Sequence, residues 1–302
     1  MKVFVSGATG FIGRHVLREL KSQGHTPMIL ARPGSEKKLD SLEGVVLLPG
    51  DISQPSQYAH LMTGADAVIH LVGIIRQFPS RGISFDLLHR QATGHMLAAA
   101  RQAGVKRFIH MSANGAAADG VSEYQTSKWQ AEELVKNSGM RWTIFRPSVI
   151  FGDAQGLPEF TSQLADIVRQ APMTPIFGQG DYLLDPVAVG DVARCMVAAL
   201  KMDNTIGKSY CMGGGAPISF AQIIQIVGKA TGRPKTRTIS IPLWLMLPLA
   251  RALGGFKFFP VTADQILMLI QGNVCDKLDY METFGITPLP FIYKNLAYLA
   301  KE

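Results

Sequence analysis

The chain has 302 residues, of which 47% are hydrophobic and 18% are charged, and its formal net charge is +7. This composition is ordinary for a soluble globular protein, and the length allows one large domain or one domain with a smaller lobe. The basic charges are scattered and form no basic run, which argues against a dedicated nucleic-acid-binding protein.

The first half of the chain alternates short apolar runs with longer amphipathic stretches. The apolar runs predict strands at residues 2–6, 27–31, 45–48, 67–71, 107–111 and 142–145. The stretches between them predict helices at residues 11–22, 54–62, 85–103 and 122–137. Apolar strands that alternate with helices are typical of a parallel sheet covered on both faces. We therefore expect residues 1–150 to form a Rossmann-like, doubly wound α/β domain.

After Arg146-Pro147 the pattern changes, because proline and glycine become frequent. Helices are predicted near residues 158–170, 190–200, 220–231, 243–253, 263–271 and 293–300. We expect residues 151–302 to form a smaller, mostly helical substrate lobe that acts as a lid. Some of its strands are expected to return to the main sheet, so the boundary near residue 150 is approximate.

A glycine-rich turn joins the first predicted strand to the first predicted helix. A helix that begins at such a turn presents unpaired backbone N–H groups, and its dipole adds partial positive charge. Both features favour a bound phosphate, and the glycines let a pyrophosphate approach the backbone. The alternative is an ordinary tight turn between a strand and a helix. We expect this turn to bind a dinucleotide through Gly7, Thr9, Gly10, Phe11, Ile12 and Gly13.

The end of the second strand distinguishes between cofactors. A site for NAD usually has a carboxylate here, which binds the ribose 2′-hydroxyl. This chain has Arg32 instead, and a guanidinium can pair with the 2′-phosphate of NADP through charge-assisted hydrogen bonds. The alternative is a solvated loop arginine. The sequence therefore favours NADP(H) over NAD(H).

Two further strand ends are candidates for cofactor contacts. Asp51 can accept a hydrogen bond from the adenine amino group while Ile52 packs on the ring; the alternative is a turn aspartate that caps the following helix. The fourth strand runs into Leu71, Val72 and Gly73. A glycine there lets the chain pass close to the ribose and the nicotinamide. His70 and His110 also lie near strand ends, where we expect packed core residues.

Tyr124 and Lys128 are the candidate chemical pair, because residues four apart share one face of a helix. A nearby ammonium group favours the phenolate and lowers the pKa of a tyrosine. The tyrosine can then exchange a proton with a hydroxyl or a carbonyl while a nicotinamide exchanges a hydride. The same lysine can hold the nicotinamide ribose. The alternative is a surface tyrosine–lysine pair without a catalytic role.

Together these motifs resemble the short-chain dehydrogenase/reductase superfamily, in its extended or atypical branch, over nearly the whole chain. The residues that carry the resemblance are the glycine turn, Asp51-Ile52, His70-Leu71-Val72-Gly73, Tyr124 with Lys128, Arg146-Pro147-Ser148 and residues 185–193. Within the superfamily the chain is most similar to bacterial relatives of the alpha-subcomplex subunit nine type of respiratory complex I. The resemblance implies a Rossmann-like fold and bound NADP(H), and in that subgroup often no established turnover.

The resemblance also implies roles for two other residues. In the superfamily a serine or threonine after the fifth strand orients the substrate oxygen, and Ser112 is the candidate here. Two alignments with the extended branch are open: in one Ser112 fills the catalytic position, and in the other it falls one residue early, so that Ala113 fills the position and Ser112, beside it, can still reach the nicotinamide or the substrate. Pro147 is an implied cofactor contact. The catalytic candidates are therefore Tyr124, Lys128 and Ser112, and no metal site is expected.

Two functions remain open from the sequence. The first is an NADP-dependent oxidoreductase, epimerase or dehydratase in which Tyr124 is the acid/base. The second is a non-turnover NADPH-binding protein with a structural, assembly or sensing role linked to complex I or quinone metabolism. The expected partners are a small-molecule substrate, which can be hydrophobic, and a protein complex, but no nucleic acid.

The cysteines and the apolar segments give expectations about location. Cys195, Cys211 and Cys275 are odd in number and lack CxxC spacing, so we expect neither a disulfide framework nor a zinc site, and a reducing, cytoplasmic compartment. The chain starts directly with a strand and has no apolar run that spans a bilayer, so we expect no signal peptide or transmembrane segment.

The most apolar segment is residues 239–259, which proline, glycine and basic residues interrupt. Its aromatic residues are Trp244, Phe256, Phe258 and Phe259. They can line a hydrophobic substrate or quinone pocket, or contact a membrane surface. The alternative is core packing of the smaller lobe.

Overall fold

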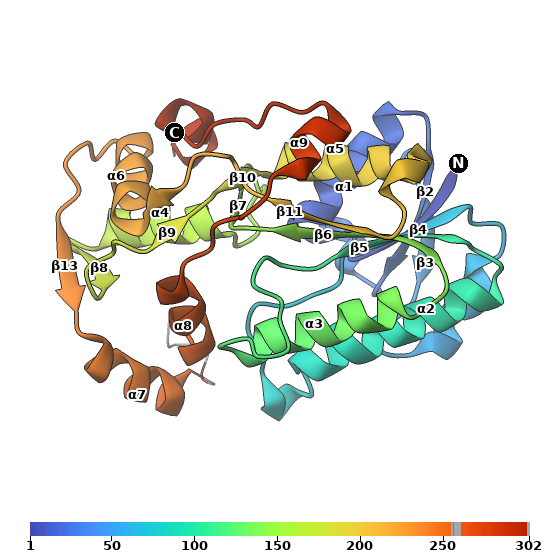
Figure 1. The fold of residues 1–302 in the computed structure, drawn as a ribbon, viewed down its shortest axis with the longest axis horizontal. Helices are drawn as coiled ribbons and strands as arrows, with labels where there is room; N and C mark the ends of the chain where they lie inside the picture. The colour runs from blue at the N-terminus through green and yellow to red at the C-terminus, as the bar shows by residue number, and fades with distance from the viewer. Residues whose placement is uncertain (255, 257–260, 301–302) are drawn as a thin grey trace. The chain divides into compact units, whose positions relative to one another are not determined.

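The computed structural model describes residues 1–254, 256 and 261–300 (Figure 1). Their contacts divide the chain into two compact units. Unit 1 consists of Met1–Arg146 and Val192–Tyr210, and unit 2 consists of Pro147–Asp191 and the chain from Cys211 onward. Each unit is therefore discontinuous in sequence. Two of the aromatic residues considered above, Phe258 and Phe259, lie outside the described residues.

The described residues form one large sheet, with seven strands in the order β11-β6-β5-β4-β1-β2-β3. In chain order these strands are β1 (Lys2–Ser6), β2 (Thr26–Ala31), β3 (Val46–Pro49), β4 (Ala67–His70), β5 (Arg107–Met111), β6 (Arg141–Pro147) and β11 (Lys208–Met212). The strands from β3 to β6 pair in parallel. All residues of β4 and β5 are buried, as both faces of the sheet are covered. The predicted Rossmann-like, doubly wound parallel sheet is confirmed.

Helices cover both faces of this sheet (Figure 1). Helices α2 (Ala92–Gln102) and α3 (Glu123–Lys136) lie on one face, and α1 (Phe11–Ser22) and α5 (Val189–Ala198) lie on the other. Helix α1 buries Val16, Leu17 and Leu20, which share one face because they are spaced by a helical turn. Ser122 caps the start of helix α3, because its hydroxyl accepts a hydrogen bond from the Gln125 amide.

Two predicted helices of unit 1 take other forms. The predicted helix at 54–62 consists of two short 3₁₀ turns, Pro55–Gln57 and Ala59–Met62. Each is too short to offset the cost of nucleating an α-helix. The predicted helix at 85–103 starts with a π-helical turn, Asp86–Gln91, which leads into α2. Such turns are frequent at functional sites, and this one carries His89.

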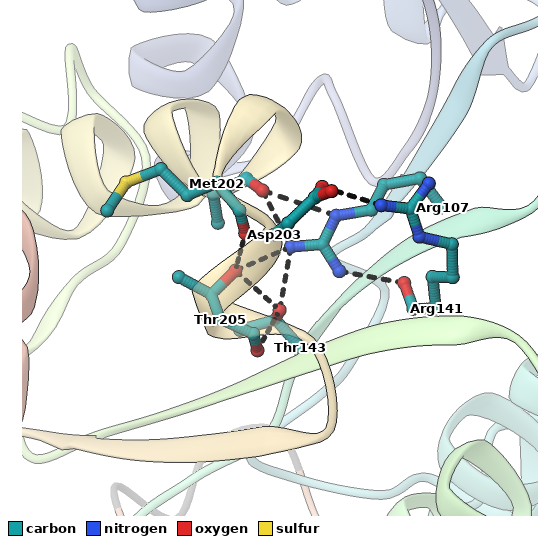
Figure 2. Close-up of polar contacts among 7 residues, drawn as sticks. Arg107, Arg141, Thr143, Met202, Asp203 and Thr205 are labelled. Atoms are coloured by element: carbon teal, nitrogen blue, oxygen red, sulfur yellow. Dashed lines mark hydrogen bonds and ion pairs between the residues drawn. The ribbon is translucent and has the colours of Figure 1, made fainter.

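A buried arginine connects the sheet to the segment that returns to unit 1 (Figure 2). Arg107 on β5 is only 6% exposed. Its guanidinium donates to the Ala199 carbonyl oxygen at 2.6 Å and to Thr143 Oγ1 and Thr205 Oγ1 at 2.8 Å each. Burial lowers the pKa of Arg107 to about 10. Ala199 and Thr205 lie 92 and 98 residues further along the chain. The Arg107 side chain therefore holds this distant segment against β5.

Helices are the longest elements of unit 2, which also has three short strand pairs among its described residues. The helices are α4 (Phe160–Gln170), α6 (Phe220–Ala230), α7 (Leu243–Leu253), α8 (Ala263–Gln271) and α9 (Asp279–Phe284). The paired strands are β7 (Ile150–Phe151) with β10 (Val187–Ala188), β8 (Thr174–Phe177) with β13 (Thr238–Ile241), and β9 (Leu183–Leu184) with β12 (Ile218–Ser219). Capping boxes start α4, α6 and α8. The core of the unit gathers residues such as Phe151, Leu164 and Phe220.

Cys211 and Cys275 form a disulfide within unit 2, across 64 residues of sequence. The expectation that the cysteines form no disulfide is therefore wrong. Pairing depends on distance in the fold rather than on spacing in the sequence, and the two Cα atoms are 5.7 Å apart. Cytosolic proteins rarely keep disulfides, so the cysteines no longer argue for a reducing compartment. The third cysteine, Cys195, is buried.

Candidate functional site

The glycine turn lies between β1 and α1, and two of its glycines are required by geometry. Gly7 has φ +79°, in the left-handed region that favours glycine. A Cβ on Gly13 would lie 2.3 Å from the Gly7 carbonyl oxygen, so only a glycine lets the helix pack this closely on the strand end. No side chain caps α1 at Gly10, and its first turn contains no acidic residue. The first amides of α1 are therefore available to an anion.

The turn after β4 lies against this glycine turn. A Cβ on Gly7 would lie 3.0 Å from the Leu71 carbonyl carbon and 3.1 Å from the Val72 amide nitrogen. The predicted cofactor residues at the ends of β1 and β4 are thus side by side. The remaining residues of the glycine turn are half-buried: Thr9, Gly10, Phe11 and Ile12.

Arg32 and Asp51 follow neighbouring strands, β2 and β3, and lie at the same edge of the sheet. Gly50 donates its amide to the Ala31 carbonyl oxygen at 3.1 Å, which brings the two strand ends together. Arg32 is exposed. The Asp51 carboxylate accepts from the Ser53 amide at 2.9 Å and from the Ser53 hydroxyl at 2.7 Å. This is the geometry of the turn aspartate described as the alternative. Ile52 packs on the core of unit 1.

The Lys128 side chain lies next to the end of β5 and the turn that follows β4. It is 3% exposed, and its Nζ donates to the Met111 carbonyl oxygen at 3.1 Å. A Cβ on Gly73 would lie 2.9 Å from this Nζ. Gly73 therefore makes room for an ammonium group of the protein itself. Tyr124, one helical turn earlier, is half-buried, and its ring meets Phe85 edge-on at 5.7 Å between centroids.

Burial shifts the pKa of both members of this pair. It lowers the pKa of Lys128 to about 8, against the opposing effect of Glu132. It raises the pKa of Tyr124 to about 12. The expectation that Lys128 lowers the pKa of Tyr124 is therefore wrong for the unliganded protein, because desolvation dominates. At neutral pH Tyr124 is a protonated phenol, which can donate a proton.

Ser112 follows β5 and donates its amide to the Phe145 carbonyl oxygen at 2.8 Å. Its hydroxyl oxygen is buried and has no hydrogen-bond partner among the described residues. A buried hydroxyl without a partner is unusual and costs stability. Pro147, the last residue of β6, belongs to unit 2.

Three histidines lie around this region of unit 1. His70 is buried, and its ring nitrogens contact Ser6 Oγ at 2.6 Å and Thr93 Oγ1 at 3.1 Å. His70 stacks on the buried ring of His110 at 5.5 Å between centroids. Burial lowers the pKa of His70 to about 3. Both side chains are core residues in this structure and stay neutral at pH 7.

His89 is a residue of the candidate site that the sequence analysis did not identify. Its Nε2 accepts from the Ile74 amide at 3.0 Å, and its Nδ1 contacts Ser127 Oγ at 2.7 Å. Its ring meets Tyr124 edge-on at 5.4 Å between centroids. These contacts connect the chain after Gly73 to α3, the helix that carries Tyr124. The only sequence signal of His89 is its place on the helix predicted over 85–103.

The described residues contain no group of three or more His, Cys, Asp or Glu side chains that could hold a metal ion. None of their helices combines the length and the apolar character that crossing a bilayer requires.

Comparison with known proteins gives matches to a family and to individual proteins. A family model described as NAD(P)H-binding matches residues 7–203. The chain is 31% identical to the mitochondrial NADH dehydrogenase (ubiquinone) 1 alpha subcomplex subunit 9 of Arabidopsis thaliana, over 89% of this chain and 68% of that protein. It is 30% identical to the ceramide reductase of Caulobacter vibrioides, over 65% of this chain and 60% of that protein.

The fold has close counterparts among solved structures. The UDP-glucuronic acid 4-epimerase of Bacillus cereus, in complex with UDP-glucuronic acid and NAD, superposes with a TM-score of 0.75 at 23% identity. The match covers 99% of this chain and 98% of that one. At this identity the likeness shows a shared fold.

Proposed function

Because the chain belongs to the NAD(P)H-binding family, whose model matches residues 7–203, we propose that it is an NADPH-dependent reductase in which Tyr124 donates the proton. The observation that carries this proposal is the buried ammonium group of Lys128 at the ends of β4 and β5. Burying a cation is costly, so its place beside Gly73 and one turn after Tyr124 is best explained by a ligand. An epimerase or dehydratase would use the same residues.

Each residue has a role in this proposal. NADPH, when bound, supplies a hydride to the carbonyl carbon of the substrate. The amides of the glycine turn hold the diphosphate. Lys128 binds the hydroxyls of the nicotinamide ribose, and Tyr124 donates its phenolic proton to the substrate oxygen. Ser112 offers its hydroxyl to the same oxygen and orients it.

Turnover by Tyr124 is tested with Tyr124→Phe. The probes are NADPH and a panel of aldehydes and ketones that includes long-chain compounds, since one relative is a ceramide reductase. We expect turnover to fall about 100-fold or more, while NADPH binds with unchanged affinity. The control is Tyr293→Phe, on an exposed tyrosine, which should keep full activity. Equal turnover in both variants would end the proposal.

The preference for NADPH rests on Arg32, an exposed guanidinium directly after β2. We propose that it pairs with the 2′-phosphate. Arg32→Glu should weaken NADPH binding about 10- to 100-fold and leave NADH binding unchanged or stronger. Arg81→Glu makes the same charge change at another exposed position and should have little effect. Calorimetry with both nucleotides measures the difference.

A second function is favoured by the similarity to subunit 9 of complex I. In this alternative the protein binds NADPH without turnover and serves in assembly or sensing within a larger complex. A ligand that binds only the folded state raises stability by mass action. NADPH should then raise the melting temperature, and no carbonyl compound tested should cause NADPH to be oxidised. Sustained NADPH oxidation that depends on Tyr124 would exclude it.

A further inference from the structure

Helix α7 in unit 2 presents an apolar face to solvent, although surface helices normally present polar residues there. Trp244 is 76% exposed, Leu245 is 50% exposed and Leu249 is 40% exposed. With a turn of about 100° per residue, the exposed residues fall on one continuous side of the helix. We call this surface the α7 face, and it consists of Trp244, Leu245, Pro248, Leu249 and Ala252. The opposite side carries Ala250, which is buried.

The α7 face lies in a segment whose only charges are positive. From Arg233 to Thr262 the sequence has five lysines and arginines and no aspartate or glutamate. Arg251, in the last turn of α7, is exposed, as are Lys235 and Arg237 before β13. The Arg233 guanidinium is already engaged, because it donates to the Val168, Arg169 and Ala171 carbonyl oxygens at the end of α4.

A polar cavity of about 210 Å³ lies where this basic segment begins, with Lys235, Arg237, Thr174 and Thr236 in its lining. The chain runs from Arg237 through β13 directly into α7. Leu243, the first residue of α7, lies six positions after Arg237, which limits the distance between them to about 20 Å. Cations and the apolar α7 face are therefore close neighbours on one unit.

We propose that the α7 face docks on an anionic membrane surface. Trp244, Leu245 and Leu249 would enter the boundary between head groups and acyl chains, where tryptophan is favoured. The exposed cations Arg251 and Arg237 would face the lipid phosphates. The 11 residues of α7 rise about 16 Å, so this helix lies along the interface and does not cross it.

A second copy of the chain fits the α7 face less well. Pairing two α7 faces would bring their positive charges together, and the segment offers no carboxylate to balance them. An anionic bilayer supplies both the apolar medium and the opposite charge.

The first experiment measures co-sedimentation of the full chain with vesicles. Vesicles of phosphatidylglycerol with phosphatidylcholine should bind the protein about 30-fold more strongly than phosphatidylcholine alone, because each of the two cations Arg251 and Arg237 contributes about fivefold near the surface. Binding should weaken at high salt. Equal binding to both kinds of vesicle, or no binding to either, would overturn the proposal.

Variants test whether the α7 face makes the contact. Trp244→Ser/Leu249→Ser should reduce binding to anionic vesicles about tenfold or more. Leu42→Ser is the matched control, because Leu42 in unit 1 is 41% exposed against 40% for Leu249, and it should bind like the parent. All three substituted positions are exposed, and unchanged melting temperatures would show that the variants fold. Equal loss in both variants would contradict the proposal.

Two further readouts separate a membrane from other occupants. Tryptophan fluorescence should shift to the blue on addition of anionic vesicles, and Trp244→Phe should remove the shift while keeping binding. A dimer that forms without lipid and dissociates in Trp244→Ser/Leu249→Ser would show that a second copy covers the α7 face, and would overturn the proposal.

Discussion

Replacing Gly13 by alanine should force α1 away from the strand end on which it packs. The new Cβ would lie 2.3 Å from the Gly7 carbonyl oxygen and 2.6 Å from the Ala8 carbonyl carbon and Cα. Real contacts of this kind stay above 3.0 Å, so the helix must move by at least 0.7 Å. All three atoms belong to the backbone, and no side-chain rotation can relieve the contact. Overpacking of this kind costs about 1–3 kcal/mol of stability.

The same movement displaces the amides that are proposed to bind the diphosphate. The loss of one well-aligned hydrogen bond to a charged group should weaken NADPH binding about tenfold or more. Calorimetric titration with NADPH, well below the melting temperature, measures the affinity, and thermal unfolding measures the stability. The matched control is Gly190→Ala in α5, where a Cβ would meet nothing within 4 Å. Unchanged affinity and unchanged stability in Gly13→Ala would refute the reasoning.

Three other predictions concern stability. Arg107→Met should lower the free energy of unfolding in urea by about 2–5 kcal/mol, because it leaves buried acceptors without donors. The control Arg141→Met, which removes an exposed ion pair, should lower it by at most about 1 kcal/mol. Similar losses in the two variants would contradict this prediction. Lys128→Met should raise the free energy of unfolding at pH 7 by up to about 3 kcal/mol. Burial lowers the pKa of Lys128 from 10.5 to about 8, so the unfolded state of the parent holds this proton more tightly than the folded state does. The stability gained by Lys128→Met should therefore vanish as the pH rises from 8 to 10.5. A stability gain that does not depend on pH would contradict the prediction. A reductant should lower the stability of the parent by about 4 kcal/mol and have no effect on Cys275→Ser, because only the parent has the bridge across 64 residues.

The elements that the sequence predicts best are those with strong local signals. β1, α1, β5, α7 and α8 match their predicted bounds to the residue. In α1 the apolar spacing and the glycine turn agree, and β5 is a short run between polar segments. The predicted helix at 54–62 fails because apolar spacing alone does not supply the length that an α-helix needs.

The sequence predicts that strands of the second lobe return to the main sheet, as β11 does, but no local signal identifies residues 192–210 as the returning segment. The return depends on contacts such as that between Arg107 and Ala199, which are 92 residues apart. The Cys211–Cys275 bridge is hidden for the same reason. Both are properties of the folded chain, and spacing along the sequence cannot reveal them.

At the candidate site the sequence predicts positions better than it predicts electrostatics. The spacing of Tyr124 and Lys128 correctly puts them one helical turn apart on α3. The direction of the tyrosine pKa shift depends on how far the ring is desolvated, and that follows from packing against Phe85 and His89. Asp51 illustrates a similar point, because its carboxylate is used by Ser53 in a turn.

The interleaved connectivity of the two units bears on how the chain emerges from the ribosome. When residues 1–146 have been synthesised, β6 has no neighbour on its outer side, because β11 (Lys208–Met212) does not yet exist. Arg107 at that stage also lacks its acceptors at residues 199 and 205. Open strand edges invite pairing with other chains. Until translation has passed Met212, the open edge of β6 is therefore a place where the nascent protein can pair with another chain.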